Sequence, residues 1–280
     1  MKKIFSIVTL FALVLVLAAC GNGSESEEGT DESAEGEPAE ISVAASPAPH
    51  AEILEKAAEI LAEEDITVNV EIVNDYTTPN RLLADEEVDA NFFQHTPYLD
   101  GEVESHGYDL ASIGNVHIEP MAVYSNDYDS LEDIPDGSTI LVSNNPAEEG
   151  RFLSFFVNAG LVEIEEGIEI QDATFDDITE NPHNFEFDNN TAPELLVNMY
   201  ENNEAPAVII NANFAIDAGL NPVDDSIVVE EGDSPYANLI AVRTGDEERP
   251  ELQRLIEVLQ SEEMTTFIEE EFGGTIIPAQ

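Results

Sequence analysis

The chain has 280 residues, and its 61 Asp and Glu against 8 Lys and Arg give a formal net charge of −53. A surface this negative repels nucleic acid and anionic lipid, which excludes functions that depend on binding polyanions. The length suits one or two domains and allows a sizeable hydrophobic core.

Residues 1–19 predict an export signal peptide. Lys2 and Lys3 precede an apolar run over residues 4–17, which is shorter than the roughly 20 residues that span a bilayer. Residues 17–21 read Leu-Ala-Ala-Cys-Gly, a pattern typical of a bacterial lipobox, so we expect Cys20 to be lipidated. The alternative is an ordinary signal peptide with a chance cysteine. Cys20 is the only cysteine, so no intramolecular disulfide can form.

Residues 20–40 are rich in Gly, Ser and Glu and contain no aromatic side chain. Such a segment buries too little apolar surface to offset the entropy of ordering, so we expect a disordered acidic tether. An acidic partner-binding tail is the alternative. With the signal peptide, the tether predicts a protein held outside the cytoplasmic membrane by an N-terminal lipid, on the cell surface or in the periplasm. We interpret the many acidic side chains as a way of keeping the surface solvated in a saline (halophilic) or alkaline exterior.

The first half of the folded part alternates strands with helices. Apolar residues predict a strand over 41–46, a helix over 53–61 and a strand over 66–73, with a short acidic helix before a third strand near 91–95. This β-α-β-α-β order is typical of a parallel sheet covered by helices. Residues 97–106 predict a helix that starts at Pro97 and stops at Gly107.

The second half predicts another α/β unit after an apolar run at 111–125, which we expect to cross between lobes with a hinge near residues 119–124. The expected elements are a strand at 139–143, a helix at 147–159, extended segments at 175–181 and 185–188, a helix at 192–200, strands at 207–211 and 236–243, and a helix at 250–272. We therefore predict a two-lobed α/β fold with two crossing strands and a ligand cleft between the lobes. Lobe 1 would hold residues 41–120 and 240–280, and lobe 2 residues 121–239.

The stretch from residue 74 to residue 100 carries the densest functional signal. Two aromatic-polar clusters, Asn-Asp-Tyr at 74–76 and Asn-Phe-Phe-Gln-His-Thr-Pro-Tyr at 91–98, fall where strands should end. Parallel sheets bind ligands at the carboxyl ends of their strands, and a mixture of rings, amides and imidazole is typical of a small-molecule pocket. The alternative is that Phe92 and Phe93 belong to the core and that His95 is a surface residue.

Arg151 is the only lysine or arginine between Arg81 and Arg243. It lies in the first turn of a predicted helix, where an arginine and free backbone N–H groups can bind a carboxylate together. A surface ion pair worth about 0–1 kcal/mol is the alternative. Asn211 at a strand end and Asn238 within an apolar strand also need hydrogen-bond partners; the first could instead cap a helix and the second could sit beside the strand ladder.

Several motifs resemble one family in content and order. They include NDYTTPN at 74–80, DANFFQHTPYL at 89–99, GNVHIEPMAVYS at 114–125, VSNNPAEEGR at 142–151, VIINANFA at 208–215 and DSPYANLIAVR at 233–243. These resemble the NlpA/MetQ-type methionine-binding lipoproteins, the substrate-binding proteins of methionine ABC importers. The resemblance covers nearly all of the chain after residue 40. It implies the type II periplasmic-binding-protein fold.

The resemblance also implies roles for individual residues. Arg151, Asn211 and Asn238 would hold the charged ends of an amino acid, while Tyr76, Phe93, His95 and Tyr98 would enclose its side chain. An aromatic cage suits a thioether, since sulfur beside aromatic edges is favourable by about 0.3–1.5 kcal/mol. Asn144, Asn145 and Glu119 are weaker candidates, with Glu119 facing the ammonium group. Phe214 stands where many members have tyrosine, which makes amino-acid binding a firmer expectation than methionine specificity. L-methionine, D-methionine and small methionine peptides all remain open.

Three other functions are alternatives to a binding protein. A metal-binding importer component could use histidines, but His50, His95, His106, His117 and His183 are scattered in the sequence, and Arg151 would repel a cation. An enzyme is disfavoured because motifs such as GxSxG, the P-loop and HExxH are missing. An adhesive lipoprotein would not need Arg151. We expect no catalytic residue, no metal and no cofactor, and a monomer that delivers its ligand to an ABC permease.

Overall fold

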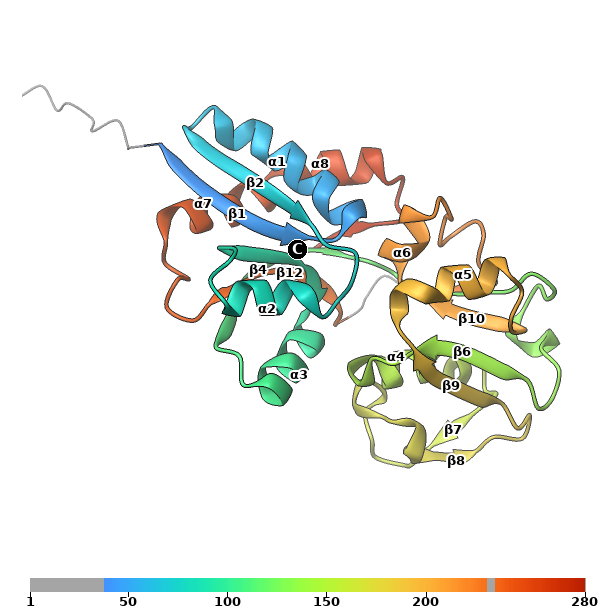
Figure 1. Ribbon diagram of the computed structural model, residues 1–280. Helices are drawn as coiled ribbons and strands as arrows, with labels where there is room; N and C mark the ends of the chain where they lie inside the picture. Colours follow the sequence, from blue (N-terminus) through green and yellow to red (C-terminus); the bar gives the residue numbers. More distant parts are fainter. Residues whose placement is uncertain (1–37, 231–234, 280) are drawn as a thin grey trace, which may run out of the picture. The chain divides into compact units, whose positions relative to one another are not determined.

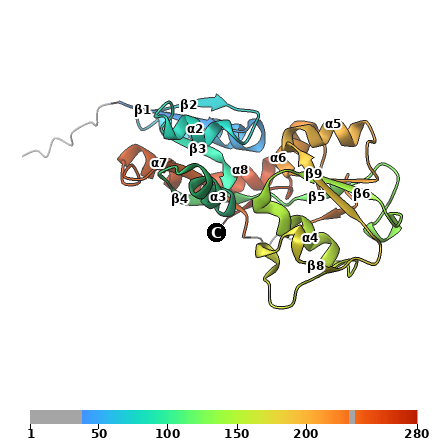
Figure 2. The same ribbon diagram turned by 60° about the horizontal axis from the view of Figure 1, so that its bottom comes forward.

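The structure, a computed structural model, describes residues 38–230 and 235–279. The predicted signal peptide, Cys20 and nearly all of the predicted tether lie outside the described residues. The described residues belong to one compact unit. Within its described part, two main β-sheets each carry helices on both faces (Figures 1 and 2).

The first sheet has six strands in the order β13-β4-β12-β3-β1-β2. They are β1 (Ala39–Ala45), β2 (Ile66–Ile72), β3 (Ala90–His95), β4 (Leu110–Ile118), β12 (Ala237–Arg243) and β13 (Ile277–Pro278). Strand β1 runs parallel to β2 and β3, as the β-α-β-α-β pattern predicts, whereas β12 is antiparallel to both β3 and β4.

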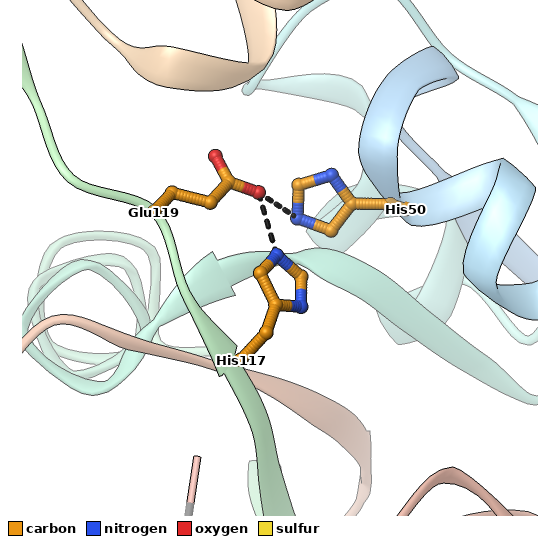
Figure 3. A group of neighbouring side chains, drawn as sticks. All are labelled: His50, His117 and Glu119. Carbon is orange, nitrogen blue, oxygen red and sulfur yellow. Dashed lines mark hydrogen bonds and ion pairs between the residues drawn. The ribbon is translucent and has the colours of Figure 1, made fainter. Parts of the chain in front are cut away.

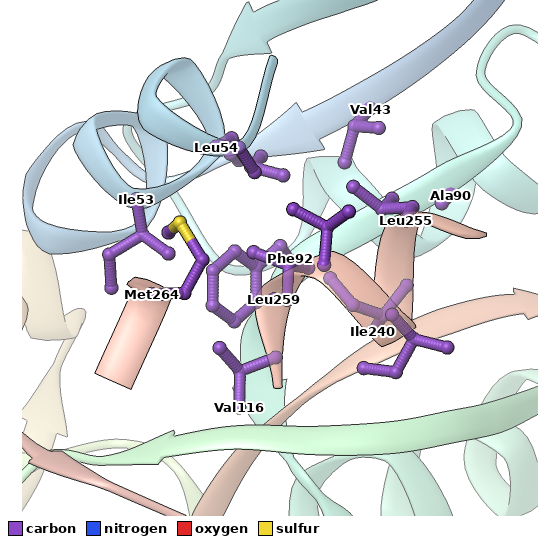
Figure 4. Packing of buried hydrophobic residues seen from close by; sticks show 14 of the residues in the cluster. Val43, Ile53, Leu54, Ala90, Phe92, Val116, Ile240, Leu255, Leu259 and Met264 are labelled. Atoms are coloured by element: carbon purple, nitrogen blue, oxygen red, sulfur yellow. The ribbon is translucent and has the colours of Figure 1, made fainter. Parts of the chain in front are cut away.

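The two faces of this sheet bury alternate residues of each strand. Ile240 and Val242 of β12 join the core formed with α1 (Glu52–Ala62), α7 (Pro250–Leu259) and α8 (Glu262–Glu271), part of which Figure 4 shows. Leu239 and Ala241 face the smaller core of α2 (Thr78–Ala84) and α3 (Thr96–His106). Each large side chain buried in this way contributes about 1.5–3 kcal/mol, so both helical layers hold the sheet in place.

The second sheet has five strands in the order β11-β5-β10-β6-β9, with β6 parallel to β10 and β9. They are β5 (Ala122–Tyr124), β6 (Thr139–Ser143), β9 (Glu186–Thr191), β10 (Ala207–Ile210) and β11 (Val228–Val229). The helix α4 (Glu149–Asn158) packs Phe152 and Phe156 against one face. The helices α5 (Leu196–Glu201) and α6 (Ala212–Asp217) cover the other face.

Short elements complete the described part. Strands β7 (Glu163–Ile164) and β8 (Ile178–Glu180) pair antiparallel in a small separate sheet. A π-type turn, η1 (Pro47–Ala51), precedes α1, and five 3-10 helices are η2 (Leu131–Asp133), η3 (Pro146–Glu148), η4 (Ile170–Asp172), η5 (Phe175–Asp177) and η6 (Pro193–Leu195).

The chain passes between the sheets where the sequence analysis expected a crossing. Strand β4 ends in the first sheet at Ile118, and β5 begins in the second sheet at Ala122. The chain returns after β11, and β12 re-enters the first sheet at Ala237. The two-sheet α/β fold is thus confirmed, while the residue boundaries of the two lobes stay a prediction.

Three local predictions were wrong. The expected helix over 250–272 is two helices, because Ser261 starts α8 by accepting a hydrogen bond from Met264 N at 3.3 Å. Residues 175–181 begin with a 3-10 helix that Thr174 and Asp177 close with a capping box, so only three of them pair as a strand. Strand β1 begins at Ala39, inside the segment assigned to the tether.

Candidate functional site

A pocket forms where strands of both sheets end. Strands β2, β3, β6 and β10 deliver their following residues to it, in keeping with the rule that α/β sheets bind ligands at the carboxyl ends of strands. Its lining residues are Tyr76, Phe93, Gln94, His95, Tyr98, Glu119, Asn145, Glu148, Arg151, Asn211, Ala212 and Asn238. The seven main residues that the sequence analysis selected therefore meet in one place, with Glu119 and Asn145.

Three aromatic rings form one wall of the pocket. The ring centroids of Tyr76, Phe93 and Tyr98 lie 5.8–5.9 Å from one another, within the range of favourable aromatic pairs. Phe214 packs at a tilt against Tyr76 with the ring centroids 5.0 Å apart, so it extends this aromatic cluster. The Tyr76 hydroxyl donates to Asn213 Oδ1 at 2.6 Å, which joins the loop after β2 to helix α6.

His95 has a defined tautomer. Its Nδ1 accepts a hydrogen bond from the backbone N–H of Tyr98 at 3.2 Å, so the proton of a neutral ring lies on Nε2. That Nε2–H donates to Glu148 Oε1 at 3.3 Å. His95 is buried in the pocket, so the alternative of an exposed loop histidine was wrong.

Arg151 is buried and held from three sides. Its Nε donates to both oxygens of Glu230 at 3.1 Å, its Nη1 to Glu148 Oε1 at 3.3 Å and its Nη2 to the backbone oxygen of Glu119 at 2.7 Å. The guanidinium carbon also lies 4.5 Å from the ring centroid of Tyr236, a cation–π contact. An arginine that is 4% exposed is no surface ion pair.

Asn211 makes a side-chain contact instead of the helix cap that was its alternative, whereas Asn238 lies in the strand ladder and makes a side-chain contact as well. Asn211 precedes α6 but its side chain does not cap that helix; its Nδ2 donates to Glu148 Oε1 at 2.8 Å. Asn238 pairs with His95 on one neighbouring strand and with His117 on the other. Its Oδ1 lies 3.0 Å from His50 Nε2.

Beneath the pocket, His50 and His117 converge on Glu119 (Figure 3). The two Nε2 atoms lie 3.1 and 2.7 Å from the same Glu119 oxygen, and both rings are fully buried. Burial lowers the pKa of His50 to about 4 and that of His117 to about 3, so both are neutral donors at pH 7. Burial raises the pKa of Glu119, which the nearby His50 and Arg151 partly oppose.

The ligand atoms of His50, His117 and Glu119 lie within 4.8 Å of one another, so this trio could hold a metal ion. The wide sequence spacing of the histidines gave no sign of it. A metal-bound imidazole usually donates its other ring N–H to an acceptor. Neither Nδ1 has a hydrogen-bond partner among the described residues, and the Arg151 guanidinium touches the Glu119 backbone. The geometry therefore favours a hydrogen-bonded network that positions Glu119.

The two asparagines that were weaker candidates, Asn144 and Asn145, lie in different places. Asn145 lines the pocket, and its Oδ1 accepts from Ala147 N at 3.1 Å. Asn144 lies outside it and lines a neighbouring groove of about 600 Å³, which shares Tyr76, Tyr98 and Asn145 with the pocket. The pocket itself encloses about 20 Å³, little more than one water needs.

Comparison with known proteins decides the family. The model of the NlpA lipoprotein family matches residues 41–280, the whole folded part. The chain belongs to the NlpA lipoprotein family. It is thus a binding lipoprotein of the membrane exterior and not an enzyme. In the described part of the chain, no helix is both long enough and apolar enough to cross a membrane.

Three relatives match most of the chain, and two of them are solved structures with the same fold. The methionine-binding lipoprotein MetQ of Bacillus subtilis is 46% identical over 280 residues, 99% of each chain. A nutrient-binding protein from Burkholderia cenocepacia, solved bound to methionine, is 35% identical with a TM-score of 0.80, covering 86% of this chain and 100% of its own. A periplasmic substrate-binding protein of an ABC transporter from Coxiella burnetii is 34% identical with a TM-score of 0.79, covering 85% and 100%.

Two polar residues of the site, Gln94 and Glu148, were not predicted from the sequence as ligand-binding residues. Gln94 belongs to a fully buried amide network in which its Nε2 donates to Asn80 Oδ1 at 2.7 Å and to Asn91 Oδ1 at 2.9 Å. Glu148 lies one helical turn before Arg151, a spacing that could have drawn attention to it. Among 61 acidic residues, however, one more glutamate carries no signal by itself.

Proposed function

We propose that this NlpA lipoprotein captures methionine outside the cytoplasmic membrane and delivers it to an ABC importer. The observation that supports this most is the convergence of an aromatic wall and a charged cluster on one enclosed pocket. Tyr76, Phe93 and Tyr98 offer the ring edges that favour a thioether. The kinship with proteins named for methionine binding supports the same ligand.

The charged end of the pocket suits an amino acid. The carboxylates of Glu119 and Glu148 can accept hydrogen bonds from an α-ammonium group, and Arg151 with Asn211 and Asn238 can donate to an α-carboxylate. Held between Tyr76 and Arg151, a ligand would bridge residues that follow strands of both sheets. Binding would thus favour a closed arrangement of two lobes, 41–120 with 240–280 and 121–239, by differential affinity for that state.

The remaining parts of the proposal concern the membrane. Lipid on Cys20 would anchor the chain, and the acidic segment up to residue 38 would let the folded part move above the membrane surface. The closed form would dock as a monomer on a permease powered by a cytoplasmic ATPase. The acidic surface would suit a saline exterior.

Isothermal titration calorimetry tests the ligand assignment. L-methionine, D-methionine and Zn²⁺ would each be titrated into the protein in high salt, after unfolding and refolding to remove carried ligand. We expect methionine to bind and Arg151→Lys to weaken it at least about tenfold, since a planar guanidinium contact to a charged group is lost. Arg81→Lys makes the same change at an exposed ion pair and is the matched control.

Zinc is included because of the trio His50, His117 and Glu119. Binding of Zn²⁺ with no response to either methionine isomer would replace the proposed ligand with a metal ion. If Arg151→Lys binds methionine as strongly as the wild type does, methionine remains the ligand but Arg151 does not have the role assigned to it.

A further inference from the structure

One imidazole nitrogen lies between two residues of the pocket. His50 Nε2 is 3.0 Å from Asn238 Oδ1 and 3.1 Å from Glu119 Oε1, and Figure 3 shows the His50 ring facing Glu119. His50 is fully buried and is not among the described residues that line the pocket. Edge contacts with Phe92 and His117, at centroid distances of 4.7 and 5.0 Å, hold the ring in place. His50 therefore acts on a ligand only through the two pocket residues that it contacts.

The surroundings of the His50 ring decide which nitrogen carries its proton. Burial lowers the pKa of His50 to about 4, so the ring is neutral at pH 7 and has a single N–H. The carboxylate oxygen of Glu119 lies beside Nε2, whereas Nδ1 is buried and has no hydrogen-bond partner in the described part of the chain. A proton on Nδ1 would leave a buried N–H unpaired, which is rare in native proteins. The proton of His50 therefore lies on Nε2.

This tautomer of His50 in turn fixes the direction of the Asn238 side-chain amide. The backbone of Asn238 is held in the ladder between His95 of β3 and His117 of β4, so the question that remains is which end of the amide faces His50. The two ends have nearly the same shape, but Oδ1 accepts hydrogen bonds and Nδ2 donates them. Because Nε2–H of His50 needs an acceptor, Oδ1 faces it. Asn238 lines the pocket, and the donor Nδ2 remains for a ligand there.

We propose that His50 is a positioning residue for ligand binding, which holds Asn238 so that its amide donates to the carboxylate of the bound amino acid. The inference rests on the proposed function, in which Asn238 is one of the donors to that carboxylate. Without the N–H of His50, the Asn238 amide is free to turn over. Its Oδ1 would then face the carboxylate, and no hydrogen bond forms between two acceptors. Glu119 supports the same arrangement, because its carboxylate favours the proton on Nε2 of His50.

The test compares ligands with and without a carboxylate. L-methionine and L-methioninol share the ammonium group and the thioether, and both are titrated by calorimetry into the purified full-length wild type, His50→Leu and His50→Gln. Leucine removes the N–H donor, whereas glutamine supplies an N–H close to the position of the lost one. His117→Leu is the matched control, since His117 is an equally buried imidazole that, within the described residues, hydrogen-bonds through its ring to Glu119 alone.

The measured quantity is the affinity for L-methionine divided by that for L-methioninol. We expect His50→Leu to lower this ratio at least about tenfold, the effect of losing a hydrogen bond to a charged group. His50→Gln should keep it within about threefold of the wild type, because the donor is restored. His117→Leu should also keep it within about threefold, because a weakened contact between Glu119 and the ammonium group affects both ligands alike.

A double variant shows whether His50 acts through Asn238. Asn238→Ala should lower the ratio as His50→Leu does. The two substitutions together should lower it no further than Asn238→Ala alone, because residues that act as one unit are not additive.

A spectroscopic measurement depends on the wild type alone. In protein labelled with ¹⁵N at histidine, the chemical shifts of the two ring nitrogens distinguish a proton on Nε2 from one on Nδ1. We expect the Nε2–H tautomer for His50 at neutral pH. The Nδ1–H tautomer would overturn the inference even if His50→Leu does not fold.

The binding results can also contradict the inference. An unchanged ratio in His50→Leu, an equal fall in His50→Gln, or additive losses in the double variant would each show that His50 does not orient Asn238. An equal fall in His117→Leu would assign the effect to the loss of any buried imidazole. Any of these results with a wild type that binds L-methionine leaves the proposed function intact, whereas a wild type that does not bind L-methionine overturns both.

Discussion

Acid should destabilise this protein through the two histidines buried beneath its pocket. In the folded protein the pKa of His50 is lowered to about 4 and that of His117 to about 3, because both rings are desolvated. In the unfolded chain a histidine titrates near pH 6.5. Between these values the unfolded chain binds more protons than the folded protein. Stability is therefore full above about pH 6.5 and falls as the pH drops toward the folded-state pKa values.

The size of the effect at pH 5 depends little on how far below 5 the folded-state pKa values lie. Each histidine loses about 1.4 kcal/mol per pH unit below 6.5, so about 2 kcal/mol at pH 5 and about 4 kcal/mol for the pair. Domains are stable by only about 5–15 kcal/mol, so the loss is a large fraction of the total. The raised pKa of Glu119 acts in the opposite direction, because the folded protein then holds a proton that the unfolded chain releases.

Urea unfolding followed by circular dichroism, at about pH 7 and about pH 5 and constant high salt, measures this loss. The variant His117→Gln keeps an N–H donor for Glu119 but cannot titrate, so we expect it to lose about 2 kcal/mol less than the wild type over that interval. His106→Gln changes an exposed histidine and should follow the wild type. If His117→Gln and His106→Gln show the same pH dependence as the wild type, buried neutral histidines are not the cause of acid sensitivity.

Two further substitutions test packing around the site. A methyl group on Gly150 would lie 2.1 Å from the carbonyl oxygen of Ile170. Gly150→Ala should therefore lower the free energy of unfolding, measured in urea, by about 3 kcal/mol or more. The control Gly101→Ala places a methyl group in open space on a helix and should be neutral or stabilise by up to about 1 kcal/mol. Asn80→Leu would leave the buried Gln94 Oε1 without its donor, which should lower the free energy of unfolding by about 1–3 kcal/mol and so lower the urea midpoint. An unchanged midpoint in Gly150→Ala or in Asn80→Leu would contradict the corresponding contact.

The sequence by itself determined the order of the elements and most of the pocket. Local patterns were sufficient for strand β6, whose bounds at Thr139 and Ser143 match the prediction, and for helix α3, which ends at Gly107 with a φ of +70°. Arg151 was detectable because a basic residue is conspicuous in a chain with so few. Aromatic and amide residues at strand ends were informative because strand ends of a parallel sheet share one edge.

Only the tertiary structure decided which of these residues touch. His50 and His117 are 67 positions apart in the sequence, and they meet because η1 and the end of β4 both reach Glu119. Glu148 was one acidic residue among many until the fold surrounded it with His95, Arg151 and Asn211. Periodicity reports which face of an element is buried, but a contact between polar side chains depends on where different elements end in space. The functional chemistry of this pocket depends on such contacts. It could therefore be identified only from the tertiary structure.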